Sequence, residues 1–119
     1  MKVKARANLK ASQALIAGNL IDSAMSRLYY ALFQAGVHAL RERSLTPEKL
    51  SSDARDGEWG HTLVRNNARL CRSRSDDRRL FRMAFSLRSQ ADYDDSSVDA
   101  VEVERIAPAI HAFVEETCR

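Results

Sequence analysis

The residues best suited to chemistry lie in one short stretch, Arg88 to Tyr93, with the sequence RSQADY. Arg88 and Asp92 are four residues apart, so their side chains can meet along one side of a helix. A carboxylate that holds the guanidinium in place leaves its remaining N–H donors for a phosphate. Tyr93 would add a hydroxyl and a stacking face. The same spacing also suits a buried Arg–Asp pair that only joins the helix ends, and the sequence leaves both interpretations open.

A second group of polar residues lies on a long segment that is predicted to be helical. They recur every three or four residues, as Arg27, Tyr30, Gln34 and His38. They share a helix face distinct from the apolar stripe of the same segment. That stripe consists of Ile21, Ala24, Leu28, Leu32, Ala35 and Ala39. We expect Arg88 to open onto a cleft beside Arg27 and Tyr30, and this cleft to bind a nucleotide or RNA with the help of Asp92.

The three histidines, His38, His61 and His111, are too far apart in sequence to form a local metal site. His61 falls at a predicted helix start, where its ring could reach a groove, and it is the candidate for a catalytic role. The sequence has no glycine-rich phosphate loop, no HExxH, no CxxC and no serine-nucleophile motif. We therefore expect no cofactor and no metal.

These residues must be positioned by helices, because glycine and proline are few and no segment alternates as a strand does. The apolar periodicity predicts an all-α fold, an antiparallel up-and-down bundle of four main helices plus a shorter one. The whole chain, residues 1–119, is expected to form one domain. The predicted helices cover about 4–17, 20–43, 59–71, 75 or 76 to 93, and 98–117. A helical turn is predicted at Thr46-Pro47-Glu48, with threonine as the cap.

Composition is ordinary for a soluble protein, with 45% hydrophobic and 29% charged residues. No apolar run approaches the roughly 20 residues that cross a bilayer. The basic N-terminus lacks the apolar core of a signal peptide, so we expect a cytoplasmic protein without membrane contact. Cys71 and Cys118 have no metal-ligand spacing and are expected to be buried thiols.

Charge is distributed unevenly along the chain. Between Arg65 and Arg88 there are eight arginines and two acidic residues, whereas between Asp92 and Glu104 there are six acidic residues and no base. The basic block could bind a polyanion, pair with the acidic block, or form a solvated surface, and the sequence does not choose among these.

Three stretches in order resemble the signatures of the HEPN domain, and the resemblance covers nearly the whole chain. They are RLYYALFQA at 27–35, HTLV at 61–64 and RSQADY at 88–93. The resemblance implies an antiparallel helical bundle that commonly forms a homodimer. It also implies a frequent pairing with a minimal nucleotidyltransferase, as in toxin–antitoxin systems.

The resemblance also implies roles for individual residues. Some HEPN domains are metal-independent ribonucleases, in which an arginine is followed about a turn and a half later by a histidine. Arg88 matches that arginine, and Tyr93 stands near the place of the histidine. In related members a tyrosine close to this motif receives AMP from the partner nucleotidyltransferase, and Tyr93 is the candidate by position.

Two functional hypotheses follow. The favoured one is a binding module for a nucleotide, an RNA or a nucleotidyltransferase partner. The alternative is an endoribonuclease in which Arg88 stabilises charge and His61 or Tyr93 assists. A tyrosine is a poor base near neutral pH because its ordinary pKa is about 10. A pure scaffold, with Tyr29 and Tyr30 as dimer contacts, is a third possibility.

Overall fold

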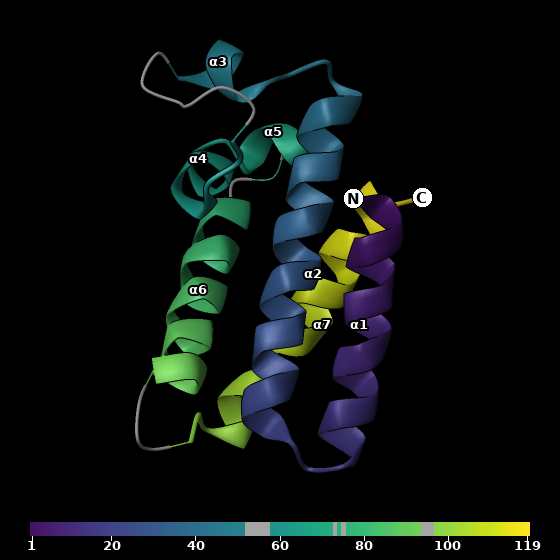
Figure 1. Cartoon of the computed structure of the whole chain (residues 1–119), viewed down its shortest axis with the longest axis vertical. Coiled ribbons are helices and arrows are strands. Elements are labelled where there is room, and N and C mark those ends of the chain that lie inside the picture. Colours follow the sequence, from purple (N-terminus) through teal and green to yellow (C-terminus); the bar gives the residue numbers. More distant parts are fainter. Residues whose placement is uncertain (52–57, 73, 75, 94–96) are drawn as a thin grey trace.

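The computed structural model describes residues 1–51, 58–72, 74, 76–93 and 97–119, and these residues are all-helical with no strand among them. Four long helices run in alternating directions, and three short ones lie between the second and the third long helix (Figure 1). In chain order they are α1 (Lys2–Ala17), α2 (Ile21–Glu42), α3 (Pro47–Leu50), α4 (His61–Asn66), α5 (Arg69–Arg72), α6 (Asp77–Tyr93) and α7 (Ala100–Thr117). Within the described part of the chain, no helix combines the length and apolar character needed to span a bilayer.

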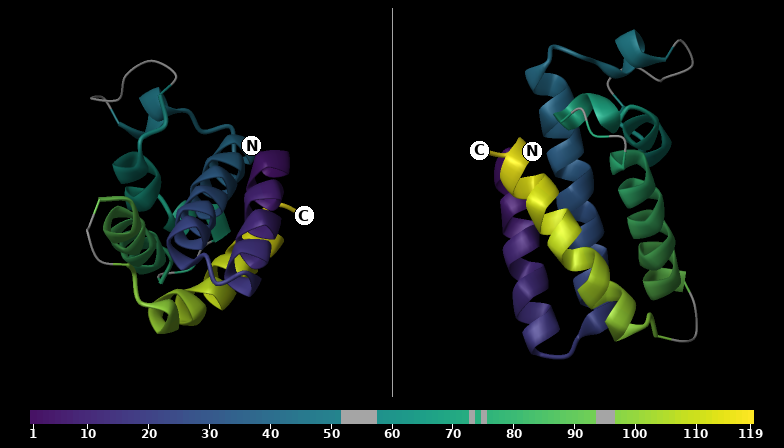
Figure 2. Two further views of the ribbon diagram at one scale, coloured as in Figure 1. Left: turned by 60° about the horizontal axis from the view of Figure 1, so that its bottom comes forward. Right: turned by 180° about the vertical axis from the view of Figure 1, so that it is seen from behind.

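Helix α2 is the centre of the molecule, with α1, α6 and α7 packed around it (Figure 2). The predicted stripe is buried from Ala24 to Ala39, but Met25, Tyr29 and Val37 are buried as well. Because three neighbouring helices pack against α2, the buried part of its surface is wider than the single apolar stripe predicted from the sequence. Tyr30 remains 39% exposed.

The connections between elements follow local rules. Residues 18–20 join α1 to α2, and Asn19 takes a left-handed conformation with φ of 61°. Thr46 caps α3 as predicted, its hydroxyl accepting a hydrogen bond from the Lys49 N–H at 3.4 Å. Asp22 on α2 accepts a hydrogen bond from the Val98 N–H at 2.8 Å, which ties α2 to the start of α7. Ser75, one of the two predicted caps of α6, lies outside the described residues.

The prediction of one continuous helix over 59–71 is wrong, because α4 ends at Asn66 and α5 begins at Arg69. The Asn67 side-chain amide donates to the Leu63 carbonyl at 2.9 Å. The Asn67 backbone N–H donates instead to the carbonyl of the next residue, Val64, at 3.1 Å. In a continuous helix the Leu63 carbonyl would accept from the Asn67 N–H instead. The side chain therefore replaces the backbone donor, and the helix ends at Asn66.

Val101, in the first turn of α7, is 57% exposed. The buried stripe of α7 runs through Val103, Ile106 and Ile110. Val101 is two residues away from the first of these, which places it on the opposite side of the helix.

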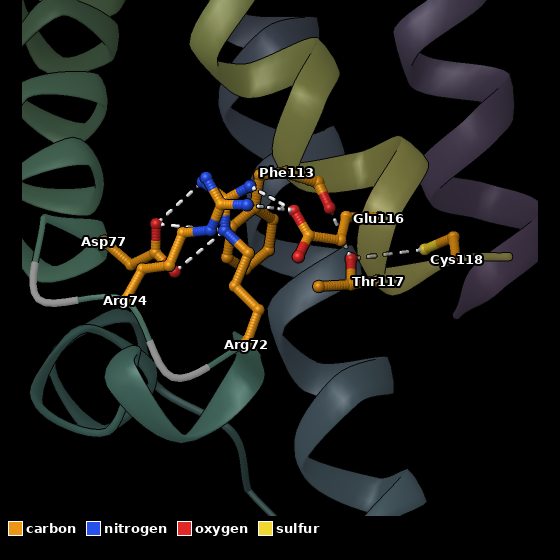
Figure 3. Close-up of polar contacts among 7 residues, drawn as sticks. All are labelled: Arg72, Arg74, Asp77, Phe113, Glu116, Thr117 and Cys118. Carbon is orange, nitrogen blue, oxygen red and sulfur yellow. Dashed lines mark hydrogen bonds and ion pairs between the residues drawn. The ribbon is translucent and has the colours of Figure 1, made fainter.

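An ion-pair network that is buried at Arg72 and Asp77 joins α5, α6 and α7 (Figure 3). The Arg72 guanidinium donates three hydrogen bonds of 2.8–3.1 Å to Asp77, whose residue is only 1% exposed. Its Nη1 donates to Glu116 Oε2 at 3.0 Å, and Arg74 lies 3.3 Å from the same oxygen. The Asp77 hydrogen bonds raise the pKa of Arg72, so this guanidinium stays charged.

Both cysteines are buried free thiols, which confirms the expectation. Cys71 Sγ lies 3.6 Å from the carbonyl oxygen of Gly36 on α2. Burial raises the pKa of the Cys71 thiol to about 12. Helix α2 packs tightly against side chains of α4 and α6 at Gly36, where a Cβ atom would lie 2.9 Å from both Phe81 and Val64.

Candidate functional site

Arg88, on the penultimate turn of α6, lies against the tyrosines of α2. Its Nη2 donates a hydrogen bond to the Tyr30 hydroxyl at 2.9 Å. Its guanidinium carbon lies 5.3 Å from the Tyr29 ring centroid and 5.2 Å from the Tyr30 ring centroid, within the range of cation–π attraction. The side chain is 19% exposed. Arg88 therefore contacts the tyrosine-bearing helix, but the cavity that Arg27 lines includes neither Arg88 nor Tyr30, so the expected shared cleft is not seen there.

Asp92 holds the guanidinium from the other side. Its Oδ2 lies 2.9 Å from Arg88 Nε. This contact is an ion pair rather than a hydrogen bond, because Nε has no hydrogen-bond partner of suitable geometry. The second oxygen of Asp92 accepts a 2.6 Å hydrogen bond from the Ser26 hydroxyl on α2. Arg88 is thus fixed between Asp92 and Tyr30, as the helical spacing of Arg88 and Asp92 predicted.

Ser26 belongs to this group, although it was not among the site residues predicted from the sequence. Ser26 lies four residues before Tyr30, so both side chains are on the same side of α2. That spacing was available in the sequence, but nothing in the sequence alone indicated that Asp92 would be its partner, 66 residues away.

Arg27 belongs to the edge of the site rather than to its centre. It is exposed, and its Nη1 donates to Asn8 Oδ1 on α1 at 3.0 Å. Asn8 in turn donates to Gln34 Oε1 at 2.8 Å. Arg27 and Asp92 both line a shallow cavity of about 380 Å³ between the ends of α2 and α6. Arg27 therefore shares a cavity with Asp92, but its bonded partner is on α1.

His61 reaches the same region through a stack of aromatic rings. Its ring lies parallel to the Phe85 ring, with centroids 3.7 Å apart and an interplanar angle of 11°. Phe85 contacts Tyr29 edge-on at 5.7 Å, and Tyr29 contacts Tyr30 at 5.8 Å. The ring stack connects the start of α4 to the surroundings of Arg88. Phe85 was not among the site residues predicted from the sequence.

Burial and nearby positive charge tune two groups in this region. Burial lowers the pKa of His61, and the charges of Arg65 and Arg88 lower it further. The neutral imidazole is therefore favoured near pH 7. Burial raises the pKa of Tyr29 to about 12, although Arg88 opposes that rise. Tyr29 consequently stays protonated and acts here as a ring rather than as an acid or base.

Tyr93 is not brought into this group. It is the last residue of α6 and is 77% exposed. Among the residues that the structure describes, none forms a hydrogen bond or a ring contact with Tyr93. Of the predicted site residues, Arg88, Asp92 and Tyr30 thus meet directly, His61 adjoins them through Phe85, and Arg27 and Tyr93 do not contact Arg88.

A separate cavity of about 560 Å³ lies between α6 and α7, on another side of α6. Met83, Leu87 and Ile106 contribute to its lining, and none of the predicted site residues does. Residues 1–51, 58–72, 74, 76–93 and 97–119 contain no group of three or more histidine, cysteine or acidic side chains placed to hold a metal ion.

No protein-family model, no curated protein and no solved structure matches this chain.

Proposed function

We propose that this chain is a HEPN-like four-helix bundle that binds the phosphate of a nucleotide or RNA at Arg88. It acts as a homodimer and pairs with a minimal nucleotidyltransferase in a toxin–antitoxin-type system. The all-helical fold supports the proposal, as do four long helices in alternating directions and the three HEPN-like stretches in order.

The observation that carries the proposal is the way in which Arg88 is held. Tyr30 takes one donor and Asp92 lies against Nε, while Nη1 has no hydrogen-bond partner among the described residues. The tyrosine rings fix the guanidinium further through cation–π contacts. An arginine positioned in this way offers its remaining donors to a phosphate without having to be ordered on binding.

Asp92 does not prevent an anion from approaching. Its charge is shared between Arg88 and the Ser26 hydroxyl, each of which occupies one carboxylate oxygen. Beyond the effect of burial, the charges of Arg65 and Arg88 both lower the pKa of His61, so positive charge acts on the ring stack. Tyr30, 39% exposed, offers part of its ring to a base or a ribose.

The experiment measures binding of ATP and of a fluorescein-labelled single-stranded RNA to the purified protein. Arg88→Ala should weaken binding about tenfold or more, since hydrogen bonds to a charged group contribute about 1.5–3 kcal/mol. Arg41→Ala removes an equal charge from an exposed position at the end of α2 and should leave binding unchanged. Equal affinity of the Arg88→Ala variant and the parent protein, for both ligands, would overturn the proposal.

The alternative function is a metal-independent endoribonuclease, and one observation favours it. His61 is held near Arg88 by the ring stack, with a lowered pKa that keeps it neutral. A neutral imidazole can accept the proton of a 2′-hydroxyl, while Arg88 stabilises the charge on the attacked phosphate.

This alternative has its own test. Purified protein should cleave RNA in the presence of a chelator, and both Arg88→Ala and His61→Gln should abolish the cleavage. Tyr93→Phe serves as the control, because Tyr93 does not contact Arg88, and it should retain full activity. If Tyr93→Phe abolishes cleavage and His61→Gln does not, the assignment of the proton transfer to His61 is wrong.

A further inference from the structure

The eight arginines between Arg65 and Arg88 divide into groups that the sequence did not separate. Three of them form ion pairs with carboxylates: Arg72, Arg74 and Arg88. Four are exposed and form no ion pair within the described part of the chain: Arg69, Arg78, Arg79 and Arg82. The eighth, Arg65, is half-buried, and its Nε donates to Asn66 Oδ1 at 3.4 Å. Unpaired, exposed guanidinium groups keep their full charge available to a partner.

Two of the unpaired arginines form a line on α6. Arg78 and Arg82 are four residues apart and therefore lie on the same flank of the helix, about 6 Å apart along its axis. Phe85 follows three residues later on that flank, and the His61 ring stacks on it. A line of two cations thus leads along α6 to the ring stack beside Arg88. We call this line, Arg78–Arg82–Phe85, the α6 ridge.

No carboxylate of α6 neutralises the ridge. The acidic residues of this helix are Asp77, which is buried against Arg72, and Asp92, which pairs with Arg88. Arg79 lies on another side, where it lines the cavity between α6 and α7.

We propose that a single strand of nucleic acid lies along the α6 ridge, with phosphates against Arg78 and Arg82 and a further phosphate at Arg88. This inference rests on the proposed function, because it extends the Arg88 site into a track. A strand that rises about 3.4 Å per nucleotide covers the interval between Arg78 and Arg82 in one to two steps. Regularly placed cations combined with an aromatic ring are the arrangement that binds single strands without sequence preference.

The chemistry favours a nucleic acid strand over an acidic protein. An acidic protein surface would use the charges, but it would not need the ring stack that continues the line. A strand uses both, because its phosphates pair with guanidinium groups while a base stacks on the ring of His61, which covers one face of Phe85.

The test measures the affinity of labelled oligouridine and of the matching oligothymidine as a function of salt concentration. Each phosphate contact on a single strand contributes about 0.7 to the slope of log K against log salt. The double variant Arg78→Ala/Arg82→Ala should therefore lower the slope by about 1.4. The double variant Lys4→Ala/Lys10→Ala removes the same charge from exposed positions of α1 and should leave the slope unchanged. A preference between the two oligonucleotides tells whether the strand is RNA or DNA.

The outcomes separate this inference from the function on which it rests. If Arg88→Ala loses affinity while the α6 double variant keeps the slope of the parent protein, the ridge is wrong and the Arg88 site stands. If the slope falls but Arg88→Ala binds normally, Arg78 and Arg82 contact the strand, but the Arg88 site and the continuation of the strand to Arg88 are both wrong. Equal slope changes in the α1 and α6 variants would overturn the ridge. The ridge is also overturned if the protein binds polyglutamate through Arg78 and Arg82 but binds neither oligonucleotide.

Discussion

Replacing Asp77 with alanine should destabilise the protein strongly without touching the candidate site. Asp77 is 1% exposed, and it accepts three of the four side-chain hydrogen bonds that Arg72 donates. In the variant, the guanidinium would stay charged and buried, with Glu116 as its one remaining carboxylate partner among the described residues. Removing one partner of a buried ion pair costs about 3–5 kcal/mol. Domains of this size unfold with about 5–15 kcal/mol, so about a fifth or more of the stability should be lost.

The assay is urea unfolding followed by far-UV circular dichroism, with thermal unfolding as a second measurement. The expected loss corresponds to a fall in Tm of roughly 10–20 °C. Arg74→Ala is the matched control, because it removes an ion pair to Glu116 from a side chain that is 60% exposed. Such an exposed pair contributes at most about 1 kcal/mol.

A double variant isolates the interaction itself. Arg72→Ala/Asp77→Ala leaves neither charge buried alone, so it should cost less than the sum of the two single variants. If Asp77→Ala proves as mild as Arg74→Ala, or if the two single variants simply add, the reasoning about a buried charge is refuted.

Three further predictions concern local environments. Arg88→Gln should raise the pKa of His61 toward its ordinary value, as followed by NMR titration of the ring, because burial and then nearby positive charge hold that pKa low. Since folded His61 binds a proton less readily than unfolded His61, stability should fall as the pH drops below about 6.5. Gly36→Ala should cost about 1–2 kcal/mol in urea unfolding, because the clash with two core side chains at 2.9 Å exceeds the gain in helix propensity. The Cys71 thiol should resist alkylation until the protein unfolds, because burial raises its pKa to about 12.

Each of these predictions has a contrary result. A His61 pKa that does not change in Arg88→Gln would show that the guanidinium does not act on the ring. Gly18→Ala, where a Cβ meets no heavy atom closer than 3.5 Å, should be neutral or slightly stabilising, and an equal loss at both glycines would contradict the clash. Alkylation of Cys71 in the native protein at the rate of a free thiol would contradict its burial.

Much of the fold was predictable because the signals are local. Apolar periodicity placed α2 and α7 within a few residues of their observed bounds, and the spacing of Arg88 and Asp92 predicted their contact. The break at Asn67 was missed because it depends on one amide side chain replacing one backbone donor. The apolar periodicity of a sequence does not reveal that a side-chain donor replaces a backbone donor.

The contacts between distant residues were harder to predict. Arg72 and Glu116 are 44 residues apart, and only the folded arrangement of α5 and α7 makes them partners. The sequence showed an arginine-rich block but not which arginines are ion-paired, since pairing depends on helix rotation. The stack of His61 on Phe85 is of the same kind, because it joins the start of α4 to the flank of α6.

The tight connection at residues 18–20 has a consequence for how the molecule assembles. Closing so short a loop costs little chain entropy, so we expect the α1–α2 hairpin to form early and to present the surface onto which later helices condense. Substitutions of the buried residues Leu9 and Leu28 should then slow folding, whereas substitution of Ile110 on α7 should mainly speed unfolding. The reverse pattern of rate changes would place the nucleus elsewhere.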